Sequence, residues 1–383
     1  MTPSVGVILS DLIDLESVNP ALKGAVPGGG EERVAKYVAD RGKEAGLSVT
    51  MQPVLGGRSN TVIHYKPEGA AGMPILLSAH MDTYPWTQGE PSGHRWSQDG
   101  LTVLGRGAAD AKASLAAMLS ALLTVSRIGV RQEVIFAATV DEEYGLGGAR
   151  RLADLGIHPA VAITGEPTRL VPIVAQKGIL RYKIEVAGPR VHAAYPSTDS
   201  SMACVGRILS RVERFGAGLR QGDVDPDNPE ADGPASVTVT QVYGDGDMNT
   251  VARRAWILLD VRYPPGVQAS RLHEELRLAV ERDEDGTVML GEPYFESPSN
   301  DARPPAPQLE SFLRVVQERT MKQPETFSYG SEAGVLSSFC AQAIVFGPGD
   351  PKYSHGPDEQ VEIAEVEEAA DILTYWLEDG VGC

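Results

Sequence analysis

The stretch LLSAHMDTYP, residues 76–85, changes character where a strand ends. An apolar run from Ile75 to Ala79 has strand character, but it stops at His80, and Asp82 follows two residues later. Burying an imidazole and a carboxylate beside a core strand costs free energy unless something binds them. One interpretation is a metal ion, with His80 as a ligand and Asp82 as the carboxylate that orients it. The alternative is a solvated loop.

Composition limits the class of protein. The chain has 383 residues, 42% of them hydrophobic, which predicts a soluble globular protein of about two domains. Lys and Arg number 34 against 52 Asp and Glu, a net charge of -18, so nucleic acid and anionic membranes are not expected as partners. There is no 18-residue apolar run and no basic signal-peptide start, and we therefore expect a cytoplasmic location.

The cysteines bear on the choice of metal ligands. Cys204, Cys340 and Cys383 are odd in number and far apart, which fits neither a disulfide framework nor a Cys-x-x-Cys zinc site. Any metal ion must therefore be held by histidine and carboxylate side chains.

Hydrophobic periodicity predicts an α/β fold around residues 76–85. Helical and strand patterns alternate in the order typical of a mostly parallel sheet. The predicted helices cover 31–45 and 112–128, and the predicted strands cover 61–65, 75–79, 133–140 and 161–165.

Near Gln176 the pattern changes to long alternating strands, typical of an α+β domain with an antiparallel sheet. Strands are predicted at 180–188, 235–244 and 255–264, and helices at 200–215 and 270–282. A Pro-rich link then leads to a strand at 343–347 and a helix at 361–378. We therefore predict one domain built from residues 1–176 and 297–383, with a second domain, 177–296, inserted into it.

Acidic and imidazole residues follow the α/β strands one after another. After His80 and Asp82 they are Asp110 in GRGAADAK, Glu142 and Glu143 in VDEEYG, Glu166 in ITGEPT, and His355 in SHGPDEQ. Ligands of open α/β sheets bind outside the carboxyl ends of the strands, and neighbouring acids repel one another unless cations lie between them. Two histidines and three carboxylates suit a pair of zinc-type ions.

The stretch GLGG (145–148) resembles half of a dinucleotide-binding fingerprint. The third glycine and the distal acid of that fingerprint are not evident in the sequence.

The motifs SAHMDTYP, GRGAADAKAS, VDEEYGLGGAR, GEPT, VHAAYP, MNTV and SHGPDE together resemble a family of di-zinc amidohydrolases and metallopeptidases. The family includes acetylornithine deacetylase, succinyl-diaminopimelate desuccinylase, aminoacylase and carboxypeptidase G. The resemblance implies that His80 and Glu166 hold one Zn²⁺, that Glu143 and His355 hold the other, and that Asp110 bridges them. It also implies that Asp82 orients His80, that Glu142 is the general base, and that Co²⁺ can replace Zn²⁺.

The inserted domain would be a lid that also forms a homodimer. His192 in VHAAYP matches the histidine that reaches the active site of the partner subunit, although a surface loop is the alternative for this residue. Asn249 and Arg262 match lid residues that contact the substrate. Val191 and Ala113 depart from the family pattern, which has glycine at both positions. The family's cis peptide would fall at Asp110–Ala111.

The resemblance implies a hydrolase that removes the acyl group from an N-acyl amino acid. A dipeptidase or a glutamate-type carboxypeptidase on the same di-zinc site is the first alternative. A non-catalytic binding protein that kept the fold is a more remote one.

Overall fold

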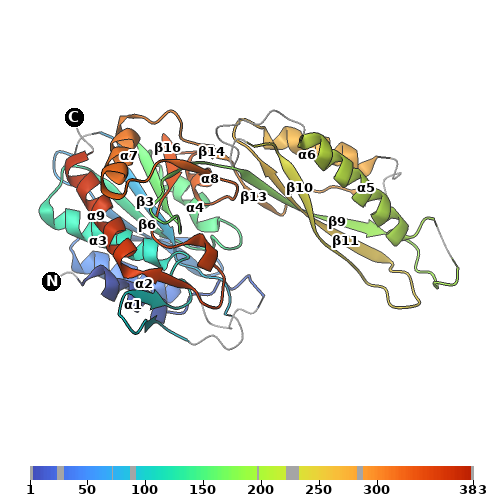
Figure 1. The fold of residues 1–383 in the computed structure, drawn as a ribbon, viewed down its shortest axis with the longest axis horizontal. Coiled ribbons are helices and arrows are strands. Elements are labelled where there is room, and N and C mark those ends of the chain that lie inside the picture. The colour runs from blue at the N-terminus through green and yellow to red at the C-terminus, as the bar shows by residue number, and fades with distance from the viewer. Residues whose placement is uncertain are drawn as a thin grey trace. The chain divides into compact units, whose positions relative to one another are not determined.

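The protein divides into two compact units that lie in different parts of the sequence (Figure 1). The computed structural model describes residues 3–23, 30–70, 72–86, 92–195, 198–220, 233–282 and 288–380. The large unit comprises Met1–Ala175, Asp301–Glu325 and Ser331–Cys383, and the small unit comprises Gln176–Asn300 and Thr326–Gly330. A segment inside the sequence of the large unit therefore forms most of a separate body.

A mixed sheet forms the centre of the large unit. Its strands lie in the order β1-β2-β6-β3-β7-β16-β8-β14, and β15 also pairs with β8. Their bounds are Ser48–Leu55, Arg58–Tyr65, Val134–Thr139, Ile75–His80, Val161–Gly165, Gln342–Val345, Ile173–Gln176, Asn300–Asp301 and, for β15, Glu325–Phe327. The central strands β6, β3, β7 and β16 are parallel to one another, and all residues of β6, β3 and β7 are buried. The predicted α/β class with a parallel-stranded sheet is confirmed for this centre.

The margins of this sheet are antiparallel, which the α/β pattern did not predict. β1 and β2 form a hairpin whose two connecting residues, Gly56 and Gly57, have φ angles of 55° and 81°. Two consecutive residues with positive φ match the turn that joins twisted antiparallel strands, and glycine adopts that conformation without steric cost. The hairpin then adds to β6 through an antiparallel β2–β6 pair.

Helices pack on this sheet and complete its core. The helices are α1 (Val5–Asp14), α2 (Glu32–Glu44), α3 (Lys112–Ile128), α4 (Gly147–Leu152), α7 (Pro307–Thr320), α8 (Ala333–Leu336) and α9 (Ile363–Tyr375). α3 is buried along most of its length and ends at Gly129, whose φ of 81° lets the chain leave the helix. A small sheet of β17 (Gln360–Glu362), β5 (Thr102–Leu104) and β4 (Arg95–Trp96) joins segments distant in sequence.

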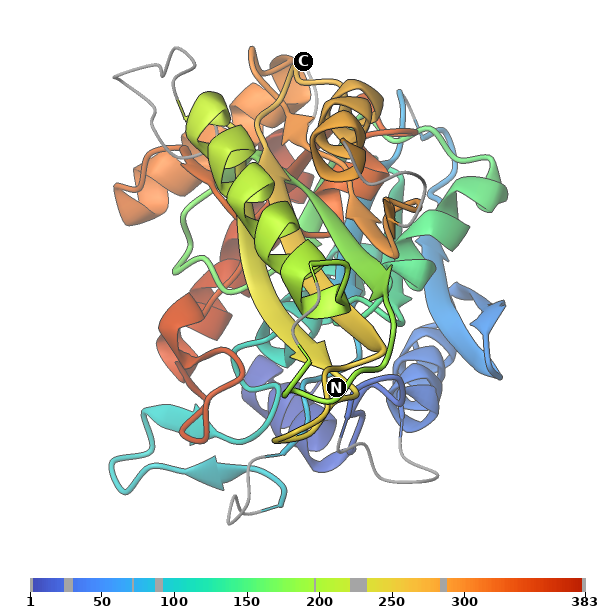
Figure 2. The same ribbon diagram turned by 90° about the vertical axis from the view of Figure 1, so that its right-hand side faces the viewer.

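The small unit has a second core between one sheet and two helices. Its strands lie in the order β10-β11-β9-β12, with β13 also paired to β9. Their bounds are Ser236–Gly244, Arg254–Tyr263, Gly178–Ala187, Val288–Met289 and, for β13, Phe295–Ser297, and the helices are α5 (Ser201–Leu219) and α6 (Ala269–Glu281). Figure 2 shows α5 lying along the sheet. Every second residue of β11, from Ala255 to Tyr263, is buried, because strand side chains alternate between faces.

No described helix combines the length and the apolar character needed to cross a bilayer.

Candidate metal centre

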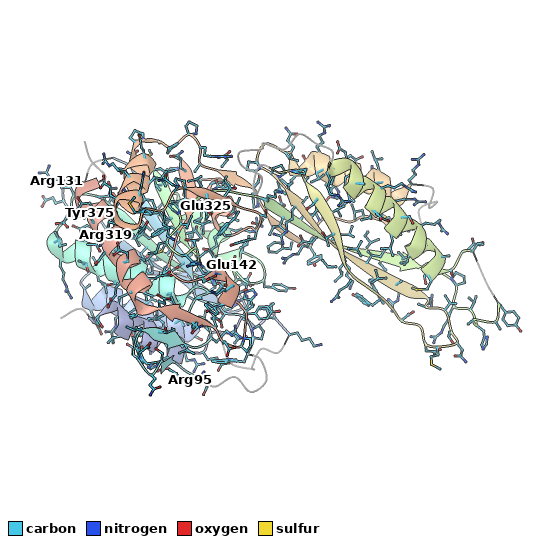
Figure 3. The ribbon with its side chains drawn as sticks, viewed as in Figure 1. Arg95, Arg131, Glu142, Arg319, Glu325 and Tyr375 are labelled. Carbon is cyan, nitrogen blue, oxygen red and sulfur yellow. The ribbon has the colours of Figure 1, made fainter. Side chains whose placement is uncertain are left out.

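The sheet of the large unit brings the strand-end residues to one edge. His80 is the last residue of β3, Glu166 directly follows β7, and Glu142 lies three residues beyond the end of β6. Since these three strands are neighbours and parallel, their carboxyl ends meet. In Figure 3, Arg131, which precedes β6, and Glu142, which follows it, are labelled on opposite sides of this unit.

The side chains form two groups in which the possible ligand atoms lie within 4.8 Å of one another. One group is His80, Glu142 and Glu166, and the other is Asp110, Glu143 and His355. All the residues expected from the sequence to bind metal thus lie in these groups, but Glu142, expected to be a base, also lies among the possible ligands.

Asp110 connects the two groups. Its Oδ1 lies 3.2 Å from Nε2 of His80, and its Oδ2 lies 3.5 Å from Nε2 of His355. Each carboxylate oxygen therefore faces a different imidazole, as a carboxylate shared by two ions requires. Within the first group, Nε2 of His80 lies 3.8 Å from Oε2 of Glu166. Within the second group, Nε2 of His355 lies 3.0 Å from Oε2 of Glu143. The Asp110–Ala111 peptide is cis, as the resemblance implied.

Asp82 fixes the orientation of His80 and the backbone of the glutamate pair. Nδ1 of His80 donates to the backbone carbonyl of Asp82 at 2.9 Å, and the Asp82 carboxylate lies 3.6 Å away. This bond places one proton on Nδ1, so Nε2, which faces Asp110, is the ring atom that a metal ion would use. The two oxygens of Asp82 accept the N–H groups of Glu142 and Glu143, each at 3.0 Å. Asp82 therefore supports both groups.

The electrostatics of the cluster favour a cation. Desolvation and the nearby Glu166 charge raise the pKa of Glu142 well above its usual range. Desolvation and the Asp110 charge do the same to the pKa of Glu143. Desolvation opposes the protonation of His80, but hydrogen bonds to Asp110 and other carboxylates outweigh it and raise the imidazole pKa. Crowded carboxylates beside two imidazoles form a donor set that fits Zn²⁺, because each bound ion would offset their mutual repulsion.

Several supporting residues were not found from the sequence. Glu359 accepts the N–H groups of Ala109 and Asp110 at 3.1 and 2.9 Å, and it pairs with Arg106 at 2.8 Å. The ring of Tyr84 stacks on that of His355, with centroids 4.3 Å apart and planes 13° apart. Glu359 and Tyr84 both lie within quoted motifs, but no local pattern indicates their contacts.

Asn19, Arg58 and Glu31 also lie beside the centre, and no sequence signal identified them. Arg58 pairs with Glu31 at 2.8 Å and with Asp141 at 3.0 Å. Asn19 donates to Asp82 and to Asp141. These residues surround the turn from which the glutamate pair projects.

The GLGG stretch has a packing role. Gly147 and Gly148 begin α4, and a Cβ added to Gly148 would lie 2.4 Å from the carbonyl oxygen of Val140. The absence of a side chain thus lets the helix approach the end of β6. Packing therefore accounts for Gly148, and no dinucleotide-binding role is needed to explain it.

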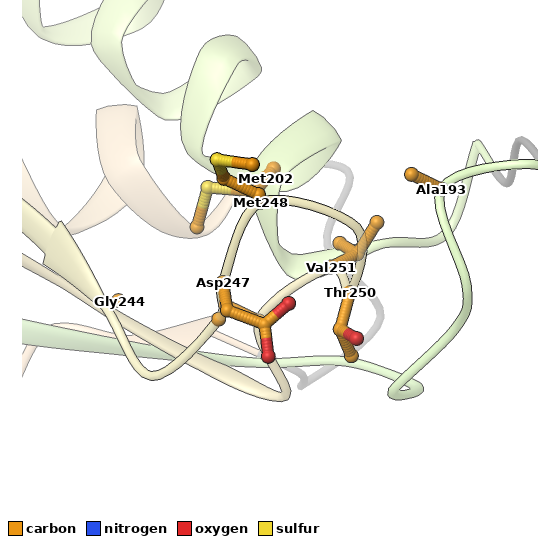
Figure 4. A pocket seen from close by; sticks show the side chains of 9 residues that line it. Ala193, Met202, Gly244, Asp247, Met248, Thr250 and Val251 are labelled. Atoms are coloured by element: carbon orange, nitrogen blue, oxygen red, sulfur yellow. The ribbon is translucent and has the colours of Figure 1, made fainter.

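The residues expected to contact substrate from the lid lie in the small unit. His192 is exposed and forms a bridge with Thr250, while the N–H of Ala193 donates to the carbonyl of Asn249 at 2.8 Å. This loop pair borders a pocket of about 410 Å³ lined by Met202, Met248 and their neighbours (Figure 4). Arg262 pairs with Asp260 at 2.6 Å, so part of its guanidinium is engaged within its own strand.

Comparisons with known proteins agree with this geometry. Residues 76–379 match the family described as peptidase family M20/M25/M40. Over 382 residues, 97% of this chain and 96% of the relative, the sequence is 28% identical to an acetylornithine deacetylase of Myxococcus xanthus.

Two solved structures illustrate the likeness of fold. An M20 family metallo-carboxypeptidase from Sulfolobus solfataricus gives a TM-score of 0.77 at 14% identity, covering 98% of this chain and 99% of that one. A dinuclear metal-binding M20 peptidase from Bacillus subtilis gives a TM-score of 0.66 at 16% identity, covering 98% and 96%. At these identities the likeness establishes the fold.

Proposed function

The chain belongs to peptidase family M20/M25/M40 and is a metal-dependent hydrolase of amide bonds, and from this premise we propose that it removes the acyl group from an N-acyl amino acid. The observation that carries the proposal is the pair of ligand groups joined by Asp110. The full-length similarity to an acetylornithine deacetylase favours a deacylase over a peptidase.

In the proposed centre, His80 and Glu166 would hold one Zn²⁺, Glu143 and His355 would hold the other, and Asp110 would be shared between them. Bound zinc would polarise the scissile carbonyl and make a water molecule easier to deprotonate; Co²⁺ would support the same chemistry. Glu142 takes the proton from the attacking water and passes it to the leaving amine. Asp82 holds the backbone of the Glu142–Glu143 pair in place during these transfers.

The test is a substrate panel. The zinc-loaded protein is assayed with N-acetyl and N-succinyl amino acids, dipeptides and peptides ending in glutamate. We expect the highest kcat/KM on an N-acyl amino acid. Preferential cleavage of dipeptides or C-terminal glutamate would assign the peptidase alternative, and zinc binding with no hydrolysis would favour a binding protein.

The role of Glu142 can be separated from that of its neighbour. Glu142→Gln keeps the side-chain volume but cannot accept a proton, so turnover should fall by roughly two to four orders of magnitude while both zinc ions remain. Glu143→Gln is the matched control and should lose an ion. Because Glu142 lies within ligand distance of His80 and Glu166, loss of zinc from Glu142→Gln would instead make it a ligand.

We further propose a homodimer formed through the small unit. β10 pairs only with β11 among the described strands, and Val242 and Tyr243 on it are each 43% exposed. A strand edge of this kind pairs readily with a second copy. In such a dimer His192 would stabilise the oxyanion in the partner's site, while Asn249 and Arg262 would bind substrate.

Subunit mixing tests this sharing. Inactive His192→Ala and inactive Glu142→Ala proteins should regain part of the activity when mixed, since some heterodimers would contain one intact site. A monomeric, fully active protein would contradict the dimer.

The substrate we propose is a small molecule. We expect neither nucleic acid nor a membrane as partner, and we expect the cytoplasm as the compartment.

A further inference from the structure

We propose that Asn19 is a positioning residue of the metal centre, holding the Asp82 carboxylate in the orientation that fixes the Glu142–Glu143 backbone. This inference rests on the proposed function of the same site. It also assigns a role at that site to the N-terminal segment, which carries none of the candidate metal ligands.

The amide of Asn19 is fully used. Its Nδ2 donates one hydrogen bond to Oδ2 of Asp82 at 2.7 Å and a second to Oδ1 of Asp141 at 3.2 Å. Its Oδ1 accepts the N–H of Ala21 at 3.0 Å, which determines which end of the amide faces the carboxylates. Asn19 is completely buried, so water cannot replace these contacts.

Both carboxylates that Asn19 bridges are connected to the backbone that carries the glutamate pair. Asp82 accepts the N–H groups of Glu142 and Glu143, and Asp141 directly precedes that pair. Without a donor between them, Asp82 and Asp141 would repel each other in a buried environment. The Asp82 carboxylate could then rotate and release one of the two N–H groups.

Asp141 has a second donor besides Asn19, which binds the same carboxylate oxygen and fixes its position. Arg58 donates to Oδ1 of Asp141 at 3.0 Å and pairs with Glu31. Asp141 also has a φ of 70°, a conformation that costs free energy for a residue other than glycine. A continuous series of hydrogen bonds therefore leads to the carboxylate that supports the centre. It passes in turn through Glu31, Arg58, Asp141, Asn19 and Asp82.

The backbone anchors Asn19 at this place. Its N–H donates to the carbonyl of Thr83 at 3.0 Å, and the N–H of Thr83 donates to the carbonyl of Ser17 at 3.0 Å. This short ladder ties the segment to the residues that follow β3. The backbone of Asn19 is therefore tied directly to the loop that carries Asp82.

The experiment compares Asn19→Ala with Gln132→Ala. Nε2 of Gln132 also makes two hydrogen bonds, to the carbonyls of Met73 and Glu133, but it lies at the other end of β6. Zinc affinity is measured by competition with a chelator, and kcat and KM are measured on the best substrate of the panel. We expect Asn19→Ala to lower zinc affinity by about tenfold or more and to lower kcat with KM unchanged. Gln132→Ala should leave zinc affinity and kcat within about twofold.

Two further variants guard against a simple loss of folding. Asn19→Ser keeps a shorter donor and should fall between the wild-type protein and Asn19→Ala in zinc affinity. Asn19→Asp keeps the volume but adds a third carboxylate, and should bind zinc less tightly than Asn19→Ser. Zinc affinities equal to wild type in the folded variants, or losses equal to those of Gln132→Ala, would overturn the proposal. The chelator titration needs no turnover, so its result stands even if no substrate is cleaved.

Discussion

Glu332 carries a prediction about the pH dependence of stability. This glutamate is only 1% exposed, and its Oε2 accepts a hydrogen bond from Ser78 at 3.1 Å. Burial raises its pKa from 4.5 to about 7. In the unfolded chain the carboxyl is exposed to water and titrates near its ordinary value.

These two pKa values determine the direction and the size of the change in stability with pH. A carboxyl whose pKa is higher in the folded state stabilises the fold below its unfolded pKa, and this contribution is lost as the pH rises through the folded pKa. A shift from 4.5 to about 7 corresponds to about 3 kcal/mol at 1.36 kcal/mol per unit. Glu332→Gln keeps the volume and stays neutral. The variant should therefore gain stability relative to the wild type, approaching about 3 kcal/mol, as the pH rises from about 4 to 8.

The assay is urea denaturation of the metal-free wild-type and Glu332→Gln proteins at a series of pH values. Every other titrating group is common to both, so the difference in unfolding free energy isolates position 332. A difference that stays constant across this range would refute the reasoning, because it would mean that the buried carboxyl loses its proton at no cost to the fold.

Variants at three further positions test the centre and its support. His355→Ala should bind one zinc ion in place of two, as metal analysis of the purified protein would show; two equivalents would contradict its assignment. Tyr84→Leu removes the ring stacked on His355 and should weaken zinc binding about two- to tenfold in a chelator titration, whereas Tyr84→Phe should not. Arg58→Met leaves the buried Glu31 and Asp141 without their cation and should lower the unfolding free energy by about 3–5 kcal/mol; a loss below about 1 kcal/mol in denaturant titrations would argue against this pairing.

The sequence predicted elements whose pattern is local. The helix predicted at 112–128 coincides with α3, Lys112–Ile128, and the strand predicted at 161–165 coincides with β7, Val161–Gly165. Both contain enough periodic or apolar residues to determine their own type. By contrast, β1 (Ser48–Leu55) was missed because it alternates only weakly and is stabilised mainly by pairing with β2.

The residues of the candidate site also fall into two classes, those with a local sequence pattern and those without one. His80 and Glu166 were identified because a polar residue directly after an apolar strand is visible in sequence, and the order of such residues indicated one sheet edge. Asn19 was missed because its bond to Asp82 spans 63 residues and leaves no mark on its neighbours. Glu359 was missed for a similar reason, since it contacts the backbone 249 residues earlier. Residues that act through distant partners have no local pattern.

The position of β16 in the large sheet has a consequence for how the chain is made. β16 begins at Gln342 but lies between β7, which ends at Gly165, and β8, which ends at Gln176. At about 5–20 residues per second, a ribosome needs on the order of 10 to 35 seconds to travel from Gly165 to Gln342. During that interval one edge of β7 has no strand to pair with, and an unpaired apolar edge is a site of aggregation. A nascent chain of this protein is therefore most in need of a chaperone between the synthesis of β7 and that of β16, and a truncation before Gln342 would make that vulnerable state permanent.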